Sequence, residues 1–139
     1  MTVRFVDTNI LLYAISRDPS ERGKADRANE IIDDGDISLS VQVLQEFYVQ
    51  ATRASRVDAI THDQAVGLVE AWCRFPVQDT SVEVMRAAMG TRIRFGISYW
   101  DAAILEAGRA LGCSVVLSED LDDGSDYDGI VVQNPFERD

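Results

Sequence analysis

The stretch that decides the fold lies at residues 3–13 and reads VRFVDTNILLY. Its first part, Val3–Val6, has the apolar character of a short buried strand, and an acid, Asp7, follows it at once. The apolar run Ile10–Ile15 then predicts a helix, which ends before Pro19 because proline cannot continue a helix. A strand that leads through an acid into a helix is typical of the start of a β–α–β unit.

The alternation of strands and helices continues along the chain. Helices are predicted from the spacing of apolar residues and from capping residues at their starts, and they cover about residues 21–34, 41–51, 61–72, 80–93 and 98–111. Further strands are predicted at Ile37–Leu39, Val77, Cys113–Leu117 and Ile130–Val132. We therefore expect one domain over residues 1–139, built as a three-layer α/β/α sandwich with a central, mostly parallel sheet.

The composition is that of an acidic globular protein. The chain has 139 residues and a net charge of −11, and Lys24 is its only lysine. No apolar run is long enough to span a membrane. The two cysteines, Cys73 and Cys113, have neither metal-ligand spacing nor a disulfide pattern, which favours the reducing cytoplasm.

A negative net charge argues against a nucleic-acid partner only at first sight. Distant acids are screened beyond a Debye length of about 8 Å at physiological salt. A bound divalent cation also reverses the sign of the local field. Nucleic acid therefore remains a possible substrate for a chain with an acidic metal site.

Four acids are expected to meet at one edge of the predicted sheet. Asp7 ends the first strand, Asp120 follows the strand Cys113–Leu117, Asp101 lies in the first turn of its helix, and Glu46 lies near the start of another. Ligands bind outside the carboxyl ends of parallel strands, where the following helices also begin. Converging carboxylates repel one another unless a divalent cation lies between them, so the pattern predicts an Mg²⁺ or Mn²⁺ site that cuts or transfers phosphates.

Each of these acids also has a purely structural interpretation. Asp7 could cap the following helix, Asp101 could complete a Ser-x-x-Asp capping box, and Glu46 could lie on a solvated helix face. Asp120 opens an acidic run that is also compatible with a surface turn.

Other acidic folds fit the sequence less well. A phospho-acceptor receiver domain would need a lysine near the last strands, and the only lysine lies far upstream. An EF-hand loop with Gly124 at its sixth position would place Leu121 at the third position, where an acidic ligand is required. A ribonuclease with two catalytic histidines is excluded, because His62 is the only histidine.

Five short motifs in sequence order resemble PIN-domain ribonucleases of the VapC toxin type. They are VDTNILLY at 6–13, QVLQEF at 42–47, SYWDA at 98–102, LSEDL at 117–121 and VQNPF at 132–136. The resemblance implies a PIN-like fold and RNA cleavage that depends on Mg²⁺ or Mn²⁺. The family's acidic residues fall on Asp7, Glu46, Asp101 and Asp120.

The resemblance also implies roles for individual residues and partners. Asp7, Asp101 and Asp120 are expected to hold the metal, and Glu46 to orient the attacking water or help hold a second ion. The supporting residues are expected to be Thr8, Asn9 and one of Asp122 and Asp123. An antitoxin protein and a homodimer are expected as well. The alternative is a catalytically inactive PIN-like interaction module.

Overall fold

A computed structural model describes residues 3–137 of the chain, in which helices and strands alternate. The helices are α1 (Thr8–Ala14), α2 (Arg22–Asp34), α3 (Val41–Ala51), α4 (His62–Trp72), α5 (Val82–Phe95) and α6 (Tyr99–Ala110), with a 3₁₀ turn η1 (Pro19–Glu21) before α2. The strands are β1 (Arg4–Val6), β2 (Ile37–Ser40), β3 (Val77–Gln78), β4 (Val115–Leu117), β5 (Asp126–Tyr127) and β6 (Ile130–Gln133).

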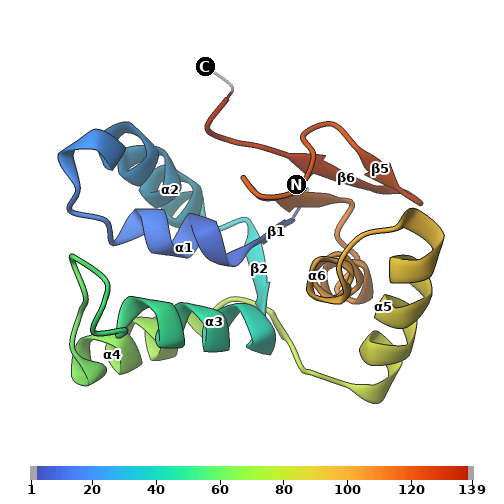
Figure 1. Cartoon of the computed structure of the whole chain (residues 1–139), viewed down its shortest axis with the longest axis horizontal. Coiled ribbons are helices and arrows are strands. Elements are labelled where there is room, and N and C mark those ends of the chain that lie inside the picture. The colour runs from blue at the N-terminus through green and yellow to red at the C-terminus, as the bar shows by residue number, and fades with distance from the viewer. Residues whose placement is uncertain (1–2, 138–139) are drawn as a thin grey trace.

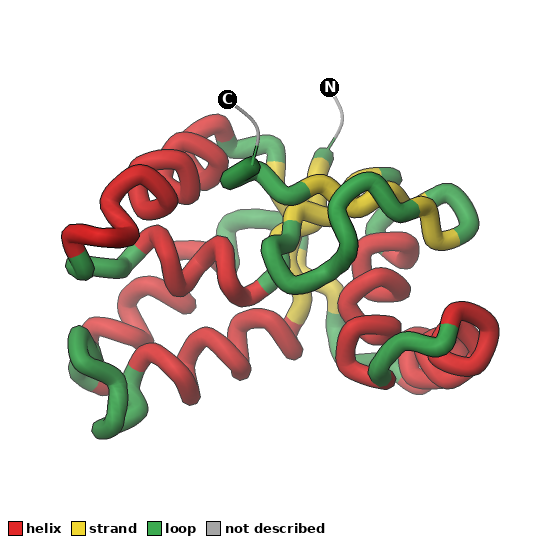
Figure 2. Tube along the Cα trace, turned by 45° about the horizontal axis from the view of Figure 1, so that its top comes forward, coloured by secondary structure: helices red, strands yellow, loops and turns green. Residues whose placement is uncertain are grey.

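The strands form one sheet in the order β3-β2-β1-β4-β6-β5. All neighbouring strands are parallel except β5 and β6, which are antiparallel. Helices α1 to α4 lie on one side of the sheet, and α5 and α6 lie on the other (Figure 1). The yellow strands lie between two groups of red helices in Figure 2, which confirms the expected mostly parallel α/β/α sandwich.

Helix α6 is the central helix of its layer. Its residues 102–108 are all buried, and they include only one charged side chain, Glu106. At Gly108 an added Cβ atom would lie 3.2 Å from the Cβ atom of Phe5. The absence of a side chain there lets α6 pack closely against β1, the strand that ends beside Asp7.

The structure differs from the sequence prediction in local details. Strand β5 was not expected, because its two residues carry no apolar run. Helix α5 is capped by Ser81, whose Oγ accepts a hydrogen bond from the Val84 amide, so the capping box expected at Thr80 is wrong by one residue. None of the helices within residues 3–137 is both long and apolar enough to cross a membrane.

Candidate active site

Asp7 lies at the junction of β1 and α1 and is 7% exposed. Its Oδ1 accepts a hydrogen bond of 2.7 Å from the Thr8 amide, so the residue caps α1 as the structural interpretation requires. Its Oδ2 accepts a 2.7 Å hydrogen bond from the Ser118 hydroxyl. The capping role uses one oxygen, and the other faces the end of β4.

Ser118 organises the loop that follows β4, and the sequence analysis did not single it out. Its buried Oγ donates to Asp7 and accepts hydrogen bonds from the amides of Asp120, at 3.1 Å, and Leu121, at 3.4 Å. The sequence feature that could have identified Ser118 is its position between the end of a predicted strand and the candidate acid Asp120. One hydroxyl therefore fixes the backbone of two site segments relative to each other.

Asn9 bridges two of the predicted acids. Its Nδ2 lies 3.2 Å from Asp120 Oδ2 and 3.5 Å from Asp7 Oδ2, and its Oδ1 accepts a 3.2 Å hydrogen bond from the Glu119 amide. A neutral donor between two carboxylates reduces their repulsion without adding a charge. The position agrees with the supporting role expected for Asn9.

Glu46 is held by one neighbour on each oxygen. Thr8 Oγ1 donates to its Oε2 at 2.9 Å, and Gln42 Nε2 donates to its Oε1 at 2.9 Å. Gln42 was not predicted as a site residue, although it lies one helical turn before Glu46, where side chains meet. The carboxylate is therefore oriented toward α1 and does not lie on a purely solvated face.

Asp101 has its carboxylate free of internal hydrogen bonds. Its amide donates to Ser98 Oγ at 3.1 Å, which caps α6. The return bond of a capping box is not formed, and no other partner for the carboxylate exists within the described part of the chain. The structural interpretation of Asp101 therefore accounts for Ser98 but not for the acid itself.

All four predicted acids line one pocket of about 170 Å³. Its other lining residues are neutral, and the complete set is Asp7, Thr8, Asn9, Leu12, Gln42, Glu46, Gln50, Trp100, Asp101, Ile104 and Asp120. The acids come from α3, α6 and the ends of β1 and β4, at the edge of the sheet where the sequence placed them. Trp100 is 64% exposed at this pocket.

Asp122 and Asp123 do not line the pocket. Asp123 Oδ1 accepts a 2.8 Å hydrogen bond from the Asn134 amide, which ties the loop before β5 to the chain after β6. A supporting role for either acid in the site stays a prediction without geometric support.

Burial without a cation changes the ionisation of Asp7. Desolvation raises its pKa from 3.8 to about 6, although the hydrogen bonds from Ser118 and Thr8 act in the opposite direction. The negative charges of Asp120 and Glu46 also contribute to this rise in pKa. A positive charge beside Asp7 would therefore stabilise the ionised form of its carboxylate.

The donor set is chemically suited to a hard divalent cation, since every charged group that lines the pocket is a carboxylate. However, among residues 3–137 no three acidic, histidine or cysteine side chains are gathered closely enough to hold a metal ion as they stand. These two observations are compatible, because side chains can line the same pocket and still lie too far apart to coordinate one ion. Binding an ion would require exposed side chains such as Asp120 to turn toward Asp7.

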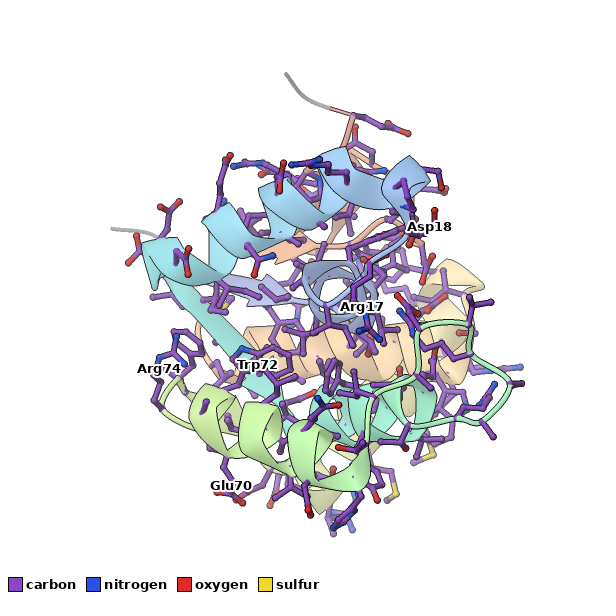
Figure 3. The ribbon with its side chains drawn as sticks, turned by 90° about the vertical axis from the view of Figure 1, so that its left-hand side faces the viewer. Arg17, Asp18, Glu70, Trp72 and Arg74 are labelled. Atoms are coloured by element: carbon purple, nitrogen blue, oxygen red, sulfur yellow. The ribbon has the colours of Figure 1, made fainter. Side chains whose placement is uncertain are left out.

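A second and larger groove adjoins the acid pocket. Its volume is about 670 Å³, and it shares Asn9, Leu12 and Asp120 with the pocket. Arg17 and Arg56 also line it, among five acids. Figure 3 shows Arg17 and Asp18 beside each other in the connection between α1 and α2, whereas Glu70 points away from the molecule on the outer side of α4.

Known structures share this fold. The DNA-bound VapBC from Salmonella typhimurium is 18% identical, with a TM-score of 0.67, and the match covers 97% of this chain and 99% of that one. A toxin–antitoxin complex from Klebsiella pneumoniae is 19% identical, with a TM-score of 0.65 and coverages of 95% and 97%. VapC20 from Mycobacterium tuberculosis, a toxin that cleaves the sarcin–ricin loop, is 18% identical, with a TM-score of 0.65 and coverages of 84% and 89%.

A comparison with curated proteins found no match. A family model described as the PIN domain matches residues 4–127, which include β1, β4 and all four acids of the pocket. The fold, the position of the acids and this match agree, and the chain belongs to the PIN domain family.

Proposed function

We propose that the chain is a divalent-metal-dependent ribonuclease that hydrolyses phosphodiester bonds of RNA and acts as the toxin of a toxin–antitoxin pair. The observation that carries the proposal is the convergence of Asp7, Glu46, Asp101 and Asp120 on one pocket. A capping role explains one oxygen of Asp7, but no such role explains four carboxylates around one cavity without a basic residue.

In this proposal Asp7 and Asp101 hold Mg²⁺ or Mn²⁺, and Asp120 contributes directly or through water. When bound, the ion supplies activation of a water molecule and stabilises charge on the phosphate oxygens. Glu46 orients the attacking water, because Thr8 and Gln42 fix both of its oxygens. Asn9 contacts both Asp7 and Asp120 and would reduce the repulsion between the two carboxylates.

The groove beside the pocket is the proposed path for single-stranded RNA. Arg17 lines it, and within the described residues its guanidinium group has no partner, so it is free to contact a phosphate. Arg56 is engaged by Asp58, with Nε and Oδ1 2.9 Å apart. Because acids outnumber the two arginines in the groove, RNA binding must depend strongly on the cation.

We expect Asp101→Asn to reduce RNA cleavage by about a hundredfold or more, since losing even an indirect metal contact commonly costs 10- to 100-fold. The substitution removes a carboxylate without internal partners, so metal-free stability should stay unchanged or rise. Cleavage of labelled total RNA with Mn²⁺, and again with EDTA, measures the effect. Asp33→Asn, which changes an exposed acid on α2 outside the pocket, is the matched control.

Wild-type protein that cleaves no RNA in Mn²⁺ would support the alternative, an inactive interaction module. Cleavage that persists in EDTA or in Asp101→Asn would instead show that the proposed metal site is not needed for the reaction.

We expect Asp7 to make metal-free stability depend on pH. Its pKa is raised in the folded state, so between about pH 4 and pH 6 the folded chain holds a proton that the unfolded chain has lost. The contribution of Asp7 to the free energy of unfolding is therefore greatest below about pH 4 and is lost as the pH rises to about 6. Asp7→Asn should remove this slope and be more stable at pH 7 by up to about 3 kcal/mol.

Urea denaturation of both proteins in EDTA, in steps from about pH 4 to pH 7.5, measures the difference. A difference that is constant over this range, or that favours the wild type at pH 7, contradicts a desolvated Asp7.

We propose an antitoxin as the second partner, in the cytoplasm where both cysteines stay reduced. Toxin–antitoxin complexes share the fold, and the acidic groove next to the pocket fits a segment that carries lysine or arginine. The protein encoded beside this chain should suppress its RNA cleavage at equimolar concentration. Unchanged cleavage in a purified mixture argues against that partner.

We propose that the chain forms a homodimer through an exposed apolar stripe on α5. Val82, Met85, Met89 and Ile93 recur at helical spacing and are 52%, 40%, 48% and 76% exposed. Apolar side chains aligned on one helix face indicate a contact surface. A second copy is the proposed occupant, because the family resemblance implies a homodimer.

We expect Met89→Glu and Ile93→Glu to convert the dimer to a monomer in analytical ultracentrifugation. Val49→Glu, at a site that is 53% exposed on α3, is the control and should leave the dimer intact. A monomeric wild type, or a dimer broken only by Val49→Glu, contradicts the proposed surface.

A further inference from the structure

Lys24 is the only lysine of a chain that contains 24 acidic residues, and it does not lie in the acid pocket. Its Nζ on α2 forms an ion pair with Glu119, in the loop after β4. The same nitrogen lies 3.3 Å from the Tyr13 hydroxyl. The single lysine is thus paired with Glu119, the residue immediately before Asp120.

Glu119 is fixed on both oxygens by residues from two helices. Tyr13 of α1 donates a 2.5 Å hydrogen bond to Oε1, and Lys24 donates to Oε2. Lys24 Nζ also lies 4.8 Å from the ring centroid of Tyr13 and 5.7 Å from that of Phe136. The Tyr13 and Phe136 rings pack edge to face with centroids 5.0 Å apart.

These contacts join α1 and α2 to the loop after β4 at the Glu119 carboxylate, and Phe136 of the chain after β6 packs against Tyr13 and near Lys24. Figure 1 shows α2 beside α1, with the chain beyond β6 running back toward α2. We define the side chains of Tyr13, Lys24 and Glu119 as the clamp. Tyr13 and Glu119 line the large groove but not the acid pocket, so the clamp lies beside the acid pocket, in the wall of the groove.

Asp120 depends on its loop for its position. It is exposed, and within the described residues its carboxylate is engaged only by Asn9, at 3.2 Å. Its amide and those of Glu119 and Leu121 donate to Ser118 or Asn9. Within residues 3–137, the Glu119 side chain attaches this loop to α2 through its ion pair with Lys24.

We propose that Lys24, acting through Glu119 with Tyr13, is a positioning residue that keeps the loop at 118–121 closed on α1 and so presents Asp120 to the pocket. The proposal rests on the proposed function, since it assigns Asp120 to metal binding. The ion pair is partly exposed, with 42% and 25% of the two side chains accessible. Its loss should therefore shift the loop population without unfolding the protein.

The chain provides a matched control on the same helix. Arg27 pairs with Glu30 at 3.3 Å within α2, and neither residue contacts the loop after β4. Arg27→Met removes a partly exposed cation and an ion pair, as Lys24→Met does. An effect of net charge or of helix stability alone would appear in both variants.

The experiment compares Lys24→Met, Glu119→Gln, Lys24→Arg and Arg27→Met as full-length proteins. Mn²⁺ binding is measured by calorimetry, and amide hydrogen exchange is followed at residues 119–121. We expect Lys24→Met and Glu119→Gln each to weaken Mn²⁺ binding by up to about fivefold and to accelerate exchange at these amides. Lys24→Arg should restore most of both properties, and Arg27→Met should match the wild type.

The double variant Lys24→Met/Glu119→Gln should be no weaker in Mn²⁺ binding than either single variant, because both changes remove the same contact. Unchanged exchange at residues 119–121 in Lys24→Met overturns the proposal, whatever happens to the melting temperature. A wild type that neither binds Mn²⁺ nor cleaves RNA overturns the proposed function instead. The exchange measurement needs no metal, so the two failures can be distinguished.

Discussion

The parallel pairing of β1 with β4 is the constraint on which the site depends. The Asp7 amide donates to the Leu117 carbonyl at 3.0 Å, and the Ser118 hydroxyl donates to Asp7 at 2.7 Å across 111 residues of sequence. The chain builds outward from β1 to β2 and β3 on one side and reaches β4 on the other. The ends of β1 and β4 therefore meet where the strand order reverses, which is where α/β sheets bind ligands.

This arrangement buries one acid beside others without a basic partner. The donors around Asp7 are the Thr8 amide, the Asn9 side chain and the Ser118 hydroxyl, all of them neutral. Neutral donors lower the cost of the buried charge but do not cancel it, as the raised pKa of Asp7 shows. The only lysine is instead bound to Glu119, outside the pocket. Among the described residues that line the pocket, no basic side chain offsets the charge of Asp7.

The sequence predicted those parts of the fold that depend on local patterns. The apolar run before Asp7 and the Ser98 cap each specify an element without knowledge of the rest of the chain, and strand direction then places the acids at one edge. Ser118 and Gln42 were missed because hydroxyl and amide side chains are common, and only strand register and helix packing bring these two to carboxylates. The Lys24–Glu119 pair spans 95 residues and has no local signal at all.

Under the proposed function, the acids of the pocket would act on RNA in two opposite ways. Without a cation they would repel phosphate in a chain with a net charge of −11, and the basic residues that line the adjoining groove within the described part of the chain are Arg17 and Arg56. With a cation the same carboxylates become its ligands, and the field that reaches the phosphate changes sign. Screening limits the repulsion from the rest of the surface to about 8 Å, so the charge inside the pocket decides whether RNA can approach. Metal binding is therefore both the source of the chemistry and the condition for substrate binding under the proposed function.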